Sequence, residues 1–160
     1  MDERDRTREK LARAVKAEME HAPLDKITVT QIVERAGLTR QTFYRNFQDK
    51  YDLVNWHFEQ LAQKSFKQMG VSLTLREALI RKFEFLKGEG TFFTQAFRSR
   101  DHNSVVAYDY QCILEFYTGI LKRKLGVEQL PQDIAFLLEM YCSASIEKTV
   151  EWVTTGMERP

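Results

Sequence analysis

The stretch from Ile27 to Lys50, ITVTQIVERAGLTRQTFYRNFQDK, predicts two short helices joined by a tight turn. Thr28 can cap the first helix, because its hydroxyl oxygen can accept from a free backbone N–H two or three residues further on. Apolar residues follow at helical spacing, and Gly37 ends the helix because glycine adopts the left-handed conformation at no steric cost. Thr39 can cap the second helix. The segment 28–47 is therefore typical of a helix-turn-helix.

The second helix has one apolar edge and one edge rich in hydrogen-bond donors. Phe43 and Phe47 lie four residues apart, so Gln41 and Arg45 point away from them, with Arg40 in the first turn. In the major groove, arginine can pair with guanine and glutamine with adenine. An ordinary amphipathic surface helix is the alternative for this helix taken alone. The capped helix and the turn before it favour DNA binding instead.

The run from Thr39 to Phe47, followed by Lys50 and Leu53, resembles the recognition helix and the next helix start of the TetR family of bacterial transcriptional regulators. The resemblance extends from about Thr7 to about Val54, with Phe-Tyr-x-x-Phe-x-x-Lys as its specific core. It implies that Lys50 holds a DNA phosphate. A cation in the first turn opposes the helix dipole, so a phosphate explains this lysine better than helix stability does. The residues predicted to contact DNA are Thr28, Thr39, Arg40, Gln41, Thr42, Tyr44, Arg45, Asn46 and Lys50.

Two positions depart from the family pattern. The family often has glycine in place of Gln41, and histidine or tyrosine in place of Asn46. We therefore expect Gln41 to read a base, with simple close approach of the backbone as the alternative. The backbone contact of Asn46 is left open.

The 160 residues allow one or two small domains, and 43% hydrophobic residues are enough to form a core. The formal net charge of +1 does not by itself predict nucleic-acid binding. Its distribution does: residues 35–50 carry four cations against one acid, whereas residues 101–160 carry five cations against nine acids. The basic charge gathers where the predicted recognition helix lies.

Helical signals continue to the end of the chain and no strand pattern appears, so we predict an all-α fold. We expect a DNA-binding domain over residues 1–50 and a helical regulatory and dimerisation domain over residues 51–160. Residues 1–6 are expected to be a frayed tail, and Gly88–Gly90 a break between helices. The expected helices outside the helix-turn-helix span residues 7–20, 49–69, 74–87, 91–98, 104–125 and 131–156.

The last two predicted helices are apolar on two sides, which indicates a partner subunit and hence a homodimer. The small residues from Cys142 to Ser145 would allow another helix to approach closely. The TetR resemblance implies that these two helices pair with their mates as a four-helix bundle. The chain end, from Glu151 to Met157, is similar to a short C-terminal class of that family, the DhaS-like class. The predicted interface residues are Tyr117, Ile120, Tyr141, Ala144 and Ser145.

No enzyme chemistry, cofactor or metal is predicted. His102, Asp109 and Cys112 form a conceivable thiol triad, but Cys112 lies on an apolar helix face and no oxyanion-hole motif accompanies it. Both cysteines, Cys112 and Cys142, are expected to be reduced core residues of a cytoplasmic protein. No apolar run approaches a membrane span of about 20 residues, and no secretory signal is seen.

Aromatic residues of the second domain could line a small-molecule pocket or simply fill the core, and core filling is the preferred interpretation. The pocket candidates are Phe66, Phe83, Phe93, Phe97 and Tyr108. The predicted function is a homodimeric regulator, with repression preferred, that binds double-stranded palindromic DNA under the control of its second domain. A small-molecule effector is one candidate signal. The alternative is a helix-turn-helix protein that acts through a protein co-regulator, as in the DhaS-like class, without a small-molecule pocket.

Overall fold

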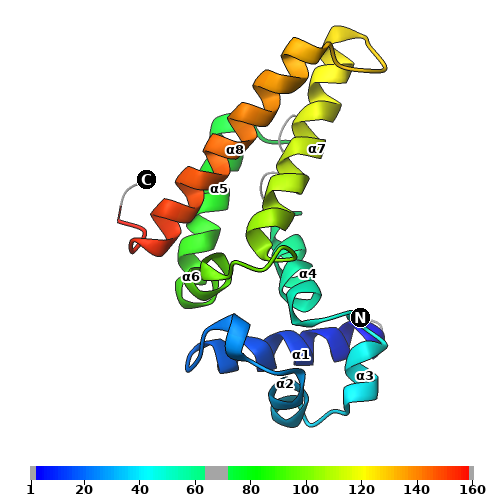
Figure 1. Cartoon of the computed structure of the whole chain (residues 1–160), viewed down its shortest axis with the longest axis vertical. Helices are drawn as coiled ribbons and strands as arrows, with labels where there is room; N and C mark the ends of the chain where they lie inside the picture. Colours follow the sequence, from blue (N-terminus) through cyan, green and yellow to red (C-terminus); the bar gives the residue numbers. More distant parts are fainter. Residues whose placement is uncertain (1–2, 64–71, 159–160) are drawn as a thin grey trace.

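The structure is a computed structural model that describes residues 3–63 and 72–158. These residues form α-helices and one short 3-10 turn, which confirms the all-α prediction (Figure 1). The elements are α1 (Glu3–Met19), η1 (Leu24–Lys26), α2 (Val29–Ala36), α3 (Arg40–Tyr44), α4 (Lys50–Ala62), α5 (Leu75–Gly88), α6 (Gly90–Arg98), α7 (Val105–Leu125) and α8 (Gln132–Thr154).

Two groups of helices lie at opposite ends of the molecule, and α4 leads from one to the other (Figure 1). At one end, α1, α2 and α3 form the N-terminal trio. At the other, α5 to α8 form the C-terminal bundle, from which the long antiparallel pair α7 and α8 projects. The end of α6 and the loop after it lie where the two groups meet, so α6 is placed to link them.

Local signals in the N-terminal trio are confirmed. Thr28 accepts from the backbone N–H of Gln31 and forms a full capping box with it, and Thr39 accepts from the N–H of Thr42. Gly37 adopts φ 65°, the left-handed conformation that ends α2. These bonds join residues three apart, so the local sequence is enough to specify them.

Large apolar side chains hold the trio together. They include Leu11 and Val15 of α1, Ile32 of α2 and Phe43 of α3, each fully shielded from solvent. Burying such a side chain stabilises a fold by about 1.5–3 kcal/mol. Phe47 is also buried, and its N–H donates to the carbonyl of Phe43 although α3 ends at Tyr44. The two phenylalanines therefore share one core although the regular helix is shorter than expected.

Some predicted boundaries are wrong. Helix α1 begins at Glu3, so residues 3–6 are helical and not a frayed tail. The negative charges of Glu3 and Asp5 in its first turn stabilise the helix by interacting with the positive end of the helix dipole. The predicted end of the fourth helix at Met69 lies outside the described residues. Ser104 occupies the cap position of α7, but its side chain makes no capping hydrogen bond.

An aromatic layer and a buried ion pair hold the C-terminal bundle together. Phe93 of α6 lies edge-on to Phe58 of α4 at 6.1 Å and packs against Phe85 of α5 at 5.6 Å between ring centres. The ammonium of Lys82 on α5 lies 2.7 Å from a carboxylate oxygen of Asp109 on α7, and both side chains are almost completely buried. The pair fixes α5 to α7.

Candidate nucleic-acid interface

Helix α3 presents the donor-rich edge that the sequence predicts. Phe43 is fully buried, whereas Arg40, Gln41 and Arg45 are exposed and Tyr44 keeps 51% of its surface exposed. Helix α2 packs against α1 and α3, and α3 lies at the end of the molecule away from the α7–α8 pair (Figure 1). The exposed side chains offer cationic and neutral donors, as major-groove recognition requires.

The guanidinium of Arg40 is oriented by contacts within the protein itself. One guanidinium nitrogen donates to the hydroxyl of Thr30 on α2 at 3.2 Å, and the guanidinium lies 5.9 Å from the ring centre of Tyr44. Most of its N–H groups stay free, because a guanidinium carries five. Gln41 and Arg45 make no side-chain hydrogen bond with any described residue. Thr30 is a supporting residue that the sequence did not reveal, since nothing in its neighbourhood marks it as a partner of Arg40.

The other polar residues predicted on this surface also serve the fold. The hydroxyls of Thr39 and Thr42 lie 3.0 Å apart, and the hydroxyl of Thr28 donates to the side-chain oxygen of Gln31 at 2.8 Å. The side-chain amide of Asn46 donates to the carbonyl of Thr42 at 2.9 Å. DNA contacts by these residues stay predictions, and each would have to coexist with a capping role.

Lys50 braces the backbone. Its ammonium donates to the carbonyls of Asp25 and Ile27, each at 2.8 Å. Burial lowers the pKa of Lys50, while the acids Asp25, Asp101 and Asp49 act to raise it. The brace accounts for a cation at the start of α4 without DNA, contrary to the argument that a phosphate explains it best. A phosphate contact through the remaining N–H stays a prediction.

Asp25 links this brace to the C-terminal bundle. One carboxylate oxygen accepts from the hydroxyl of Ser99, after α6, at 2.5 Å and from the hydroxyl of Tyr51 at 3.0 Å. The Ser99 bond holds the pKa of Asp25 below its usual value. Burial and the Asp25 carboxylate raise the pKa of Tyr51 to about 12.

Glu89, between α5 and α6, forms a second link. One carboxylate oxygen lies 2.7 Å from the ammonium of Lys16 on α1 and 3.1 Å from Nε2 of His57 on α4. The His57 ring stands edge-on to Phe92 at 5.1 Å. Burial lowers the pKa of His57; burial would raise that of Glu89, but its two hydrogen bonds outweigh this and keep it low. Glu89 therefore connects the start of α6 to both α1 and α4.

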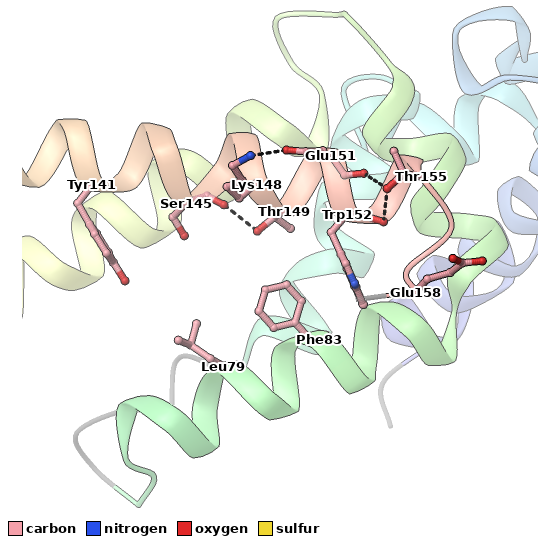
Figure 2. Close-up of a pocket in the computed structure, with 10 residues that line it drawn as sticks. All are labelled: Leu79, Phe83, Tyr141, Ser145, Lys148, Thr149, Glu151, Trp152, Thr155 and Glu158. Carbon is pink, nitrogen blue, oxygen red and sulfur yellow. Dashed lines mark hydrogen bonds and ion pairs between the residues drawn. The ribbon is translucent and has the colours of Figure 1, made fainter. Parts of the chain in front are cut away.

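The predicted aromatic pocket does not assemble. Phe93 and Phe97 are core residues, 0% and 2% exposed, and the hydroxyl of Tyr108 donates to Glu59 at 3.0 Å. Phe66 lies outside the described residues. Phe83 lines a cavity, which opens between α5 and α8 and not among the predicted partners (Figure 2). Helix packing across the bundle, rather than aromatic content, decides where this space lies.

The residues predicted at the dimer interface fall into two groups. Tyr117 and Tyr141 pack edge-to-face at 5.5 Å between α7 and α8 of the same chain. Ile120 and Ser145 are half-buried, and Ala144 is exposed. The large exposed apolar side chains on α8 that the predicted set omits are Phe136, Leu137 and Met140, at 61%, 58% and 54%. Their helical spacing places them near Ala144 on one face.

The conceivable thiol triad is not formed, since Asp109 pairs with Lys82 and His102 lies beside Asp101. Over residues 3–63 and 72–158, no three His, Cys, Asp or Glu side chains gather as metal ligands. Among the helices described, none is long and apolar enough to cross a membrane.

Comparisons with known proteins match both halves of the chain. The model for bacterial regulatory proteins of the tetR family matches residues 11–55, and the model for a transcriptional regulator C-terminal region matches residues 74–160. None of the curated proteins matches the chain. Ten chains of solved structures match it. One, the dihydroxyacetone kinase operon activator DhaS, has a TM-score of 0.64 and 22% identity, covering 94% of this chain and 85% of its own; this likeness shows a shared fold.

Proposed function

Because this chain belongs to the TetR family of bacterial transcriptional regulators, we propose that it represses transcription by binding a palindromic operator as a homodimer in the cytoplasm. The observation that carries the proposal is the exposed, donor-rich edge of α3 behind a fully capped α2. Residues 1–50 form the proposed DNA-binding domain, and residues 51–160 the proposed regulatory and dimerisation domain.

Dimerisation is proposed through α7 and α8. The apolar side chains on the outer face of α8 would be covered by the same face of a second copy, as two-fold symmetry requires. Two α3 helices could then enter successive major grooves about 34–36 Å apart. A signal received by the C-terminal bundle would change this spacing through α6 and the links of Glu89 and Asp25.

Selection from random DNA duplexes with the purified full chain tests the proposal. We expect enrichment of a near-palindrome whose half-sites lie about one helical turn apart. Absence of any enriched sequence at modest salt would rule out sequence-specific binding. It would favour action through a protein co-regulator instead.

The direction of control needs a separate measurement, because the similar DhaS structure is named an operon activator. A reporter gene placed behind the selected operator would be compared with and without the regulator. Repression predicts that the regulator lowers expression. A rise that depends on the intact operator would show activation.

A further inference from the structure

A groove between α5 and α8 combines the features of a small-molecule site. Two adjoining cavities, of about 500 and 820 Å³, share Leu79, Phe83, Trp152 and Glu158 in their walls. Figure 2 shows Leu79 and Phe83 extending from α5 toward Trp152 on α8. Either cavity falls within the range of roughly 300–1,000 Å³ typical of sites for drug-sized ligands. We call this space the α5–α8 groove.

Aromatic side chains form the centre of the α5–α8 groove. The rings of Phe83 and Trp152 meet edge-to-face, with centres 5.0 Å apart and planes at 79°. Leu79 lies one helical turn before Phe83, and Tyr141 lies on the same side of α8. Such a lining favours a ligand with an aromatic, largely apolar body, because burying that body removes apolar surface from water.

The polar groups at the groove indicate what else the ligand carries. The indole N–H of Trp152 is buried and has no acceptor within the described residues. The hydroxyls of Thr149 and Thr155 already donate to the carbonyls of Ser145 and Glu151 on their own helix. Trp152 thus offers a donor that lacks a partner, and a ligand acceptor could satisfy it. This nitrogen is shielded from solvent, so the atoms that cover it have to move before a ligand acceptor can reach it.

Charge around the groove is balanced. Three cations and three anions line the two cavities: Arg76, Lys87, Lys148, Glu84, Glu151 and Glu158. Lys148 and Glu151 neutralise one another at 2.6 Å. A net charge on the ligand would therefore gain little from the groove, while it would lose hydration on entry.

We propose that the α5–α8 groove binds a neutral aromatic molecule that carries a hydrogen-bond acceptor, such as an aromatic ketone, with the acceptor on Trp152. The groove is also connected to α6, because the hydroxyl of Thr94 on α6 donates to the carbonyl of Val153, next to Trp152, at 3.3 Å. Use of the site as a regulatory input rests on the proposed function. Binding itself does not.

Benzophenone and diphenylmethane form a matched pair of probes, because they have similar shapes and only benzophenone carries an acceptor. Equilibrium dialysis of each probe against the DNA-free full chain should show benzophenone bound about tenfold more tightly, as expected when an orphan buried donor gains a partner. Trp152→Phe keeps an aromatic ring but lacks the N–H, so this variant should bind the two probes equally. Trp56→Phe, which changes a tryptophan packed on Phe47 in the other half of the chain, is the matched control and should preserve the preference.

Near-ultraviolet irradiation of bound benzophenone provides an independent location, because the excited ketone inserts into nearby C–H bonds. Peptide mass spectrometry should place the label on α5 around Leu79 and on α8 around Trp152. Labelling of the Phe136–Met140 face instead, equal binding of both probes by the unmodified chain, or no binding of either would overturn the proposal. None of these outcomes bears on operator selection, which is measured separately with DNA.

Discussion

The two ends of this molecule leave opposite kinds of side chain uncovered. On α3 the exposed groups are polar or cationic, as with Arg40 and Arg45, whereas on α8 they are apolar, as with Phe136 and Met140. Charged and hydrogen-bonding groups suit phosphates and base edges, while an exposed apolar face suits another protein surface. One chain therefore carries two exposed surfaces of opposite chemical character, and substitutions can alter each of them separately.

Breaking the buried ion pair between Lys82 and Asp109 should have the largest effect, and this effect should be on the stability of the C-terminal bundle. Asp109→Ala leaves the ammonium of Lys82 buried without its carboxylate, so we expect a loss of about 3–5 kcal/mol in the free energy of unfolding, measured in urea. The double variant Lys82→Met with Asp109→Leu should recover most of it. A loss below about 1 kcal/mol for Asp109→Ala would show that the charge finds other partners.

Placing a charge on the apolar face of α8 should separate association from folding. Ala144→Arg puts a large cation where two copies are proposed to meet, so sedimentation should show monomers with helicity retained. Operator affinity should fall about a hundredfold or more, since one half-site then binds without the other. Thr91→Arg, on the exposed surface of α6, is the control and should stay dimeric. A dimeric Ala144→Arg variant would move the interface elsewhere.

Substitutions of exposed residues on α3 should alter DNA specificity and leave the melting temperature nearly unchanged. A bidentate base contact contributes about 1–3 kcal/mol of discrimination. Arg40→Ala should relax selection at one position of each half-site more strongly than Gln41→Ala, because Thr30 and Tyr44 already orient Arg40 while Gln41 must lose its freedom on binding. Binding-site selection with each variant would measure this. An unchanged motif for either variant would exclude that residue as a base reader.

Lys50 lies between the two ends, and its substitution should modestly lower both the stability of the fold and the affinity for DNA. Lys50→Ala removes two hydrogen bonds to carbonyls, so we expect a loss on the order of 1 kcal/mol in unfolding free energy. It should weaken binding to every sequence alike and lower the salt slope by about 0.9 per subunit. Arg45→Ala should weaken binding overall with a small sequence effect. A change of motif with Lys50→Ala would contradict a phosphate contact.

The smallest expected effect is a pH dependence at the junction between the two ends. Because burial lowers the pKa of His57 from 6.5, the folded state binds fewer protons there than the unfolded state. Its contribution to stability is complete above pH 6.5 and declines as the pH falls below it. Glu89 acts in a lower window, below 4.5, where its carboxylate becomes protonated in the unfolded chain first.

Urea unfolding at about pH 7.5 and about pH 5.5 checks this dependence, for which we expect a decline below about 1 kcal/mol. His57→Gln should remove most of it. His102→Gln changes an exposed histidine beside Asp101 and is the control. A decline that persists in His57→Gln would assign the proton uptake to another group.

The helix-turn-helix can be predicted from the amino-acid sequence, because its signals are local. The capping side chains of Thr28 and Thr39 and the left-handed Gly37 act over three or four residues, and all three behave as predicted. Amphipathic spacing likewise predicts that Phe43 is buried and that the opposite edge of α3 is exposed, as the structure shows. Side chains that must be buried, or must bond to their neighbours, leave a periodic trace that can be read without a structure.

Contacts between residues that are distant along the chain could not be predicted in this way. The bonds of Lys50 to Asp25, of Ser99 to Asp25 and of Lys16 to Glu89 span 25 to 74 residues. No local pattern marks them, because each depends on how α1, α4 and α6 pack together. The same holds for the α5–α8 groove. A cavity is the space that packed helices leave between them, so residue types alone could suggest aromatic lining but could not place it.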